Sequence, residues 1–247
     1  MTRWKAAAIH FGISLAIGVC AALLIFGVWY PPPYSHAAGA DELVMLLLGV
    51  DVVLGPLLTL VVYKRGKKSL RFDLAVIALL QICAFSYGMS VVVRARPAFV
   101  VSRIDRFVLV AANDLDADDL AKGSEPQFRV IPWTGPKIVG ALLPDDAQSR
   151  NALMFSGVAG KDLEKFPQYF VDYDKAAPQL LAKAQPLAKL LEAKPEARST
   201  VERFLADKHT DAEHVVWLPL VARRASLTMV LDRASGKPLG AVVVDPW

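Results

Sequence analysis

Three long runs of apolar residues dominate the first part of the chain, and shorter apolar segments separated by polar residues make up the rest. The runs cover residues 6–29, 43–63 and 74–93, and Asp51 is the only formally charged residue in them. Each run is long enough to cross the roughly 30 Å hydrocarbon core of a bilayer as a helix. The pattern therefore predicts three transmembrane helices within residues 1–93.

The first run also raises the question of a cleaved signal peptide, because Ala38-Gly39-Ala40 has the form of a cleavage site. A signal peptide has an apolar core of roughly 7–15 residues. The run at 6–29 is longer, and two further runs follow it. We therefore expect it to stay in the protein as a membrane helix.

Residues 94–247 have the length of one ordinary soluble domain. Segments rich in Val and Ile predict strands over 99–112, 127–132, 214–222, 226–232 and 239–244. Helical patterns cover 114–122, 145–158, 178–193 and 196–208, and Asp145 is the expected cap of the second of these. Strands, then helices, then strands indicate an α+β domain.

The distribution of basic residues predicts the topology. Two Lys or Arg residues precede the first run and five lie in 64–73, whereas the loop 31–42, which we expect to be polar and irregular, has none. Basic residues concentrate in short cytoplasmic loops. The N-terminus and 64–73 are therefore expected in the cytoplasm, and 94–247 on the other side. In a bacterium with two membranes this describes a multi-pass inner-membrane protein with a periplasmic C-terminal domain.

Composition narrows the possible partners. The chain is 54% hydrophobic, with a mean hydropathy of +0.37. Its net charge of +4 comes mainly from residues 1–73, since the remainder carries 21 basic and 20 acidic residues. The basic character thus flanks the lipid bilayer and forms no nucleic-acid surface. Both cysteines, Cys20 and Cys83, lie inside apolar runs, which excludes a disulfide framework in the soluble part.

Asp51 is the sharpest candidate for a functional site, because an ionisable residue at bilayer depth costs about 2.5–3.5 kcal/mol on insertion scales. Gln81 lies on the third run at a depth that differs from that of Asp51 by roughly 7 Å, at 1.5 Å per helical residue. Pro56 cannot donate to the carbonyl of Val52, which leaves that carbonyl available to a partner. Asp51, Gly55, Pro56 and Gln81 together form the candidate intramembrane interaction site.

Three interpretations of Asp51 stay open at this point. It is a neutral, hydrogen-bonded residue that holds the three helices together, a docking point for a transmembrane helix of another protein, or part of an ion or proton path. The last is disfavoured because the runs contain no second acid. Glycines at 12, 18, 27, 49, 55 and 88 are expected to permit close packing between the helices.

The sequence contains no recognisable catalytic or cofactor motif. Asp114, Asp116 and Asp118, with Glu125 at the twelfth position, imitate a calcium-binding loop, but Asp119 stands where that loop needs glycine. Neither H-E-x-x-H nor G-x-S-x-G occurs, and no glycine-rich loop follows a strand. We therefore expect no metal, no cofactor and no enzymatic activity.

Several segments carry a resemblance to a known family. Arg3-Trp4-Lys5 leads into the first run, Gly49–Thr59 lies in the second, Val101–Phe107 opens the soluble domain, and Val244-Asp245-Pro246-Trp247 ends the chain. Together they resemble the type IV pilin accessory proteins of the TfpX/TfpZ type, which are related to the FimB fimbrial assembly proteins. The resemblance covers essentially the whole chain, and D-V-x-L-G-P-L-L-T is its most specific part.

This resemblance implies an inner-membrane protein that modulates assembly or retraction of a type IV pilus and has no catalytic residues to carry over. Its expected partners are the major type IV pilin or membrane proteins of the pilus machine. The alternative is a membrane-anchored sensor whose periplasmic domain binds a small ligand. That alternative is weaker, because only the N-terminal tail and a ten-residue loop are expected to face the cytoplasm.

Overall fold

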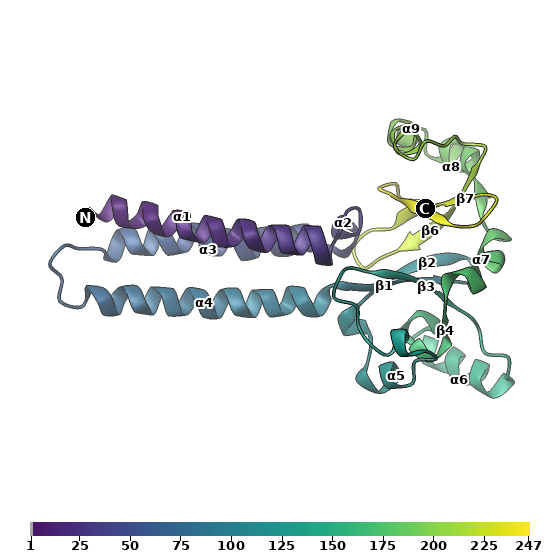
Figure 1. The fold of residues 1–247 in the computed structure, drawn as a ribbon, viewed down its shortest axis with the longest axis horizontal. Coiled ribbons are helices and arrows are strands. Elements are labelled where there is room, and N and C mark those ends of the chain that lie inside the picture. Colours follow the sequence, from purple (N-terminus) through teal and green to yellow (C-terminus); the bar gives the residue numbers. More distant parts are fainter. Residues whose placement is uncertain (1) are drawn as a thin grey trace.

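The computed structural model, which describes residues 2–247, consists of three long helices that extend from one side of a sheet domain (Figure 1). Helix α1 covers Arg3–Leu24 and continues as a π-helical turn, η1, over Ile25–Trp29. Helices α3 and α4 cover Ala40–Val62 and Leu70–Ala95. All three are long and apolar enough to cross a membrane. They overlap the predicted runs and extend beyond them at several ends.

The three helices meet along α3, since both α1 and α4 pack against it. Their tightest packing lies at the end next to the sheet domain, in a cluster that includes Ile25, Tyr30, Val44 and Val92. Elsewhere most apolar side chains of these helices face outward. This is the arrangement that lipid requires, because an apolar surrounding removes the need to bury them.

The sheet domain begins at Pro97, directly after α4, and its strands form one mixed sheet. The strands are β1 Pro97–Arg103, β2 Arg106–Ala111, β3 Lys137–Ala141, β4 Phe170–Val171, β5 Gln185–Pro186, β6 Val215–Val221, β7 Leu227–Asp232 and β8 Pro238–Val242. Their order is β4-β3-β1-β2-β6-β7-β8, with β5 beside β6. The pairs β1–β3 and β2–β6 are parallel, and the other pairs are antiparallel.

Helices cover both faces of this sheet. They are α2 Tyr34–Ala38, α5 Ala117–Ala121, α6 Ala147–Val158, α7 Tyr173–Leu181, α8 Leu187–Ala193 and α9 Arg198–Asp207. Successive strand residues point to opposite faces, so Val100 joins the core beneath α7, while Phe99 and Val101 join the core on the side of α6. A third core lies between β6–β8 and the helices α8 and α9. The predicted fold, three membrane helices followed by an α+β domain, is confirmed.

Four local predictions are corrected. The segment 127–132 contains no strand: a 3₁₀ turn covers Pro126–Phe128, and the strand comes later as β3. The helix predicted at 178–193 is two helices, α7 and α8, separated by β5. Helix α6 is capped by Asp146 instead of Asp145, because the Asp146 carboxylate accepts a hydrogen bond of 2.7 Å from the Ser149 amide.

The fourth correction concerns the predicted irregular loop 31–42, which contains α2 and the start of α3. Gly39 makes the turn between these helices with φ of +76°, a conformation that residues with a Cβ rarely adopt. Ala37 is fully buried in the core of the sheet domain, and its carbonyl accepts a 3.0 Å hydrogen bond from the amide of Arg224. Glu42 and Arg224 also form an ion pair. The loop therefore attaches the membrane helices to the sheet domain.

Candidate intramembrane interaction site

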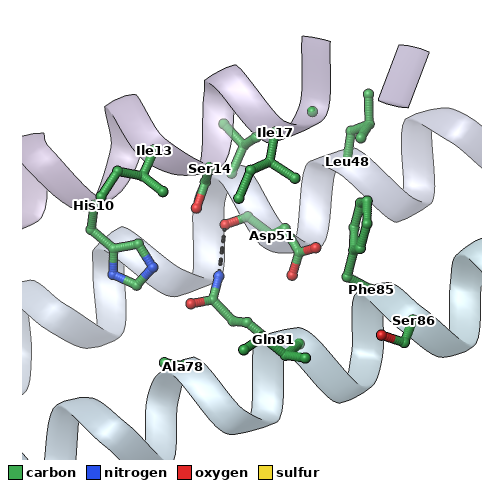
Figure 2. A pocket seen from close by; sticks show the side chains of 13 residues that line it. His10, Ile13, Ser14, Ile17, Leu48, Asp51, Ala78, Gln81, Phe85 and Ser86 are labelled. Atoms are coloured by element: carbon green, nitrogen blue, oxygen red, sulfur yellow. Dashed lines mark hydrogen bonds between the residues drawn. The ribbon is translucent and has the colours of Figure 1, made fainter. Parts of the chain in front are cut away.

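Three of the four predicted site residues, Asp51, Gly55 and Gln81, lie together where α3 packs against α4. The side-chain amide of Gln81 donates a 3.1 Å hydrogen bond to the backbone carbonyl of Asp51 (Figure 2). Gly55, one turn further along α3, is buried beneath that amide: a Cβ built on Gly55 would lie 2.1 Å from Gln81 Nε2. Because residue 55 has no side chain, the Gln81 amide can lie against α3 and reach the Asp51 carbonyl.

The carboxylate of Asp51 points away from this hydrogen bond. Its Oδ1 atom is buried and has no hydrogen-bond partner among residues 2–247. The carboxylate borders a cavity of about 260 Å³ between α1, α3 and α4, whose walls also include His10, Ser14 and Ile17 of α1 and Gln81 and Phe85 of α4 (Figure 2). A second opening of about 390 Å³ lies between α3 and α4 and is again bordered by Asp51. Asp51 therefore borders two largely apolar openings, while its Oδ1 atom is itself enclosed.

Pro56 does not join the other three residues. It lies on the side of α3 that faces α1, in a shallow groove with Trp4, Phe11 and Leu60. Helix α3 continues through Pro56 to Val62. The carbonyl that Gln81 binds is that of Asp51, one residue before the Val52 carbonyl that Pro56 leaves without its usual donor. Gln81 therefore binds the carbonyl of Asp51 and not that of Val52.

The expected role of the glycines holds at three positions of the six. A Cβ at Gly88 would lie 2.4 Å from Leu47 Cδ1, and one at Gly18 would touch Leu48 at 3.4 Å, so these two, with Gly55, lie at helix contacts. At Gly12, Gly27 and Gly49 a Cβ would meet nothing within 4 Å. Close approach of the helices therefore depends on the first three.

Two hydrogen bonds between helices escaped the sequence analysis. The His10 ring nitrogen Nδ1 and the Thr59 hydroxyl, 2.6 Å apart, join α1 to α3. The hydroxyl of Tyr30, the residue after η1, donates to the Val92 carbonyl at 2.8 Å and joins this end of the first helix to α4. A helical pattern was available for Thr59, because Asp51, Gly55 and Thr59 follow one another at four-residue spacing and so share one face of α3. No comparable pattern identifies Tyr30.

The acidic segment that imitates a calcium loop is neutralised by basic side chains. Lys161 pairs with both Asp116 and Asp119, and Arg223 pairs with Asp114 at 2.9 Å. The hydrogen bond from Lys161 is the main reason that the pKa of Asp119 is lowered. Within residues 2–247, no group of His, Cys, Asp and Glu side chains is arranged to hold a metal ion. These contacts give the segment a structural role.

Comparison with known proteins finds fimbrial assembly proteins. Residues 1–39 match the family described as "Fimbrial assembly protein FimB". The fimbrial assembly protein of serogroup I from Dichelobacter nodosus is 33% identical over 246 residues, which cover 98% of this chain and 95% of that protein. The serogroup E1 protein of the same organism is 31% identical over the same shares of both chains. A third relative, from serogroups C1 and C2, is 39% identical over 118 residues, 47% of this chain. No solved structure gives a significant match.

Proposed function

We propose a function from one premise: this chain belongs to the FimB family of fimbrial assembly proteins. Its role is in pilus assembly. More specifically, we propose that it is an inner-membrane accessory protein that modulates the assembly or dynamics of a type IV pilus through protein–protein contacts and without catalysis. Its partner is the major pilin or a membrane protein of the pilus machine.

The observation that carries this proposal is the buried Oδ1 atom of Asp51, which has no hydrogen-bond partner among residues 2–247. Its carboxylate borders the cavity between α1, α3 and α4, which we call the Asp51 groove. A polar atom without a partner at bilayer depth is costly. A helix of another protein that enters the groove with a hydrogen-bond donor would satisfy it. Hydrogen bonds between transmembrane helices contribute about 0.6 kcal/mol on average and about 1–2 kcal/mol in model peptides, which is enough to set the position of a helix that is already in the membrane.

The proposed orientation supports the same partner. The basic residues around α1 and in 64–73 favour a cytoplasmic N-terminus and a periplasmic sheet domain. A membrane-anchored pilus subunit with a periplasmic head could then contact this protein twice, with its helix at the Asp51 groove and with its head at the sheet domain. Two weak contacts on one subunit add through effective concentration.

Site-specific photo-cross-linking in cells tests this function. A photoreactive residue replaces Ile17 or Ile82, which border the groove, or Leu15 or Leu80, which are comparably exposed and lie outside it. Residues two apart on a helix point in nearly opposite directions. Leu15 is therefore the control for Ile17 on α1, and Leu80 is the control for Ile82 on α4. We expect Ile17 and Ile82 to capture the pilin or an identified pilus-machine protein. Capture of neither from the groove positions, or equal capture from the controls, would contradict the proposal.

A further inference from the structure

A loop of the sheet domain lies level with the ends of the membrane helices, although it is far from them in sequence. Strands β1 and β3 run parallel, with Phe99 beside Lys137, so the residues just before β3 lie next to the point where α4 becomes β1. We define the segment 130–136 as the Trp133 loop. Its position is a consequence of strand order.

Several contacts hold the Trp133 loop against the helix ends. Arg96, the residue after α4, donates to the Val93 carbonyl at 2.6 Å and to the Pro132 carbonyl at 3.4 Å. The same guanidinium lies 4.4 Å from the centre of the Trp133 ring. Trp133 and Trp29, the last residue of η1, have ring centres 6.3 Å apart. The ring is therefore fixed where the first and third membrane helices end.

The backbone of the Trp133 loop also contacts the end of the first membrane helix, at Gly135. A Cβ at this position would lie 2.9 Å from the carbonyl oxygen of Val28, and its φ of +90° is one that other residues rarely adopt. Glycine thus allows the loop to rest directly on η1. The loop reaches the helix end by backbone contact as well as through its side chains.

The outward side of the Trp133 loop exposes two large apolar side chains. Trp133 is 60% exposed and Val130 is 65% exposed, and Trp133 lies at the ends of helices that are long and apolar enough to cross a membrane. Tryptophan is enriched at this depth, where the ring contacts acyl chains and headgroups together. Arg94, exposed at the penultimate position of α4, adds a cation at the level of the lipid phosphates. Apolar exposure and positive charge at one level match the chemistry of a phospholipid surface.

We propose that the Trp133 loop is an anchor that inserts into the headgroup region of the bilayer and fixes the tilt of the sheet domain on the membrane. The chain connects α4 to β1 at one place, and the α2 contacts support one side of the sheet. The Trp133 loop, next to β3, supports the domain at a second place. The inference depends on the membrane helices and is independent of the proposed role in pilus assembly.

The chain contains a matched control for this anchor. Trp247 is 61% exposed, and its ring lies 5.7 Å from the Arg106 guanidinium. In the antiparallel pair of β1 and β2, Arg106 is the register neighbour of Arg103. Arg103 is the last residue of β1, and Pro97 is the first. Seven strand residues at about 3.3 Å each separate the two ends by roughly 20 Å. Trp133 and Trp247 therefore have equal exposure and different distances from the membrane.

The test is fluorescence quenching of the full chain in vesicles of phosphatidylethanolamine and phosphatidylglycerol. In single-tryptophan variants that keep Trp133 or Trp247, the other four tryptophans are replaced by phenylalanine. A lipid with a nitroxide near its ester linkage should quench Trp133 several-fold more than Trp247. Equal quenching of the two would overturn the proposal.

A second measurement avoids replacing the buried tryptophans, whose loss endangers folding. After Cys20→Ala and Cys83→Ala, a single cysteine replaces Trp133 or Trp247 and carries a nitroxide label. Its electron paramagnetic resonance signal reports whether oxygen from the bilayer or a water-soluble nickel complex reaches the label. We expect oxygen to dominate at 133 and nickel at 247. Dominance of nickel at both positions would refute the anchor.

Discussion

Replacing Gly55 by alanine tests the geometry of the intramembrane site, because one added carbon collides with one identified side chain. The new Cβ would lie 2.1 Å from Nε2 and 2.6 Å from Cδ of Gln81. Atoms that are not bonded do not approach so closely, so the Gln81 amide must move and its hydrogen bond to the Asp51 carbonyl is lost. Such bonds average about 0.6 kcal/mol in membrane proteins, with a maximum of about 1.7 kcal/mol. We predict a loss of stability in this range for Gly55→Ala.

The measurement is a double-mutant cycle on the free energy of unfolding of the full chain in bicelles. Gly55→Ala is compared in the presence of Gln81 and in a Gln81→Ala background, where the collision and the bond are both absent. The cost of Gly55→Ala should nearly vanish in that background. Gly49→Ala is the control on the same helix, because its Cβ meets nothing within 4 Å. The reasoning fails if Gly55→Ala costs the same in both backgrounds or no more than Gly49→Ala.

Two further predictions concern the junction and the sheet domain. Tyr30→Phe removes the buried hydrogen bond to the Val92 carbonyl. Chemical denaturation should show a free energy of unfolding that is lower by about 0.5–1.5 kcal/mol. An unchanged free energy would mean that this bond contributes nothing to the junction. For Asp119, whose pKa is lowered by Lys161, the stabilisation is complete above the ordinary carboxyl pKa of about 3.9 and lost as the pH falls through the lowered value. Acid unfolding of Asp119→Asn should lack this component, and identical acid curves for the variant and the wild type would exclude it.

The sequence was sufficient for features that depend on local pattern. The membrane helices follow from apolar length alone, and most strands follow from runs of β-branched residues. The similar depth of Asp51 and Gln81 follows from helix geometry, because antiparallel helices place their residues at calculable levels. The contact itself also requires that the two faces match, and the bond is made to the backbone carbonyl of Asp51. The close packing of Gly55 was expected only in general terms. Its particular partner depends on which face α4 presents to α3.

Features that depend on tertiary choice were missed. The segments 127–132 and 137–141 both contain apolar residues, and β3 forms at the second because it pairs with β1 and because Gly140 lets α7 approach. A Cβ at Gly140 would lie 2.5 Å from that of Ala176 in α7. The helical pattern predicts a helix that starts at Pro178. Helix α7 instead begins at Tyr173 and tolerates the proline inside it.

The attachment of the loop 31–42 to the sheet domain also lay outside local pattern. Three prolines and small residues indicate an irregular connection, and nothing nearby identifies Arg224 as a partner 187 residues after Ala37. The same holds for Trp133, which reads locally as part of a turn. Its place beside Trp29 results from the order of strands in the sheet, which no local signal encodes.

The central claim is that the Asp51 groove receives a hydrogen-bond donor from a membrane helix of the pilus system. Counting surface pili in strains with Asp51→Asn and Asp51→Leu, at equal amounts of this protein in the membrane, tests it most directly. Asparagine keeps the accepting Oδ1 and leucine removes it at a similar volume. The account predicts normal piliation with asparagine and clearly fewer pili with leucine. Normal piliation with leucine would contradict it.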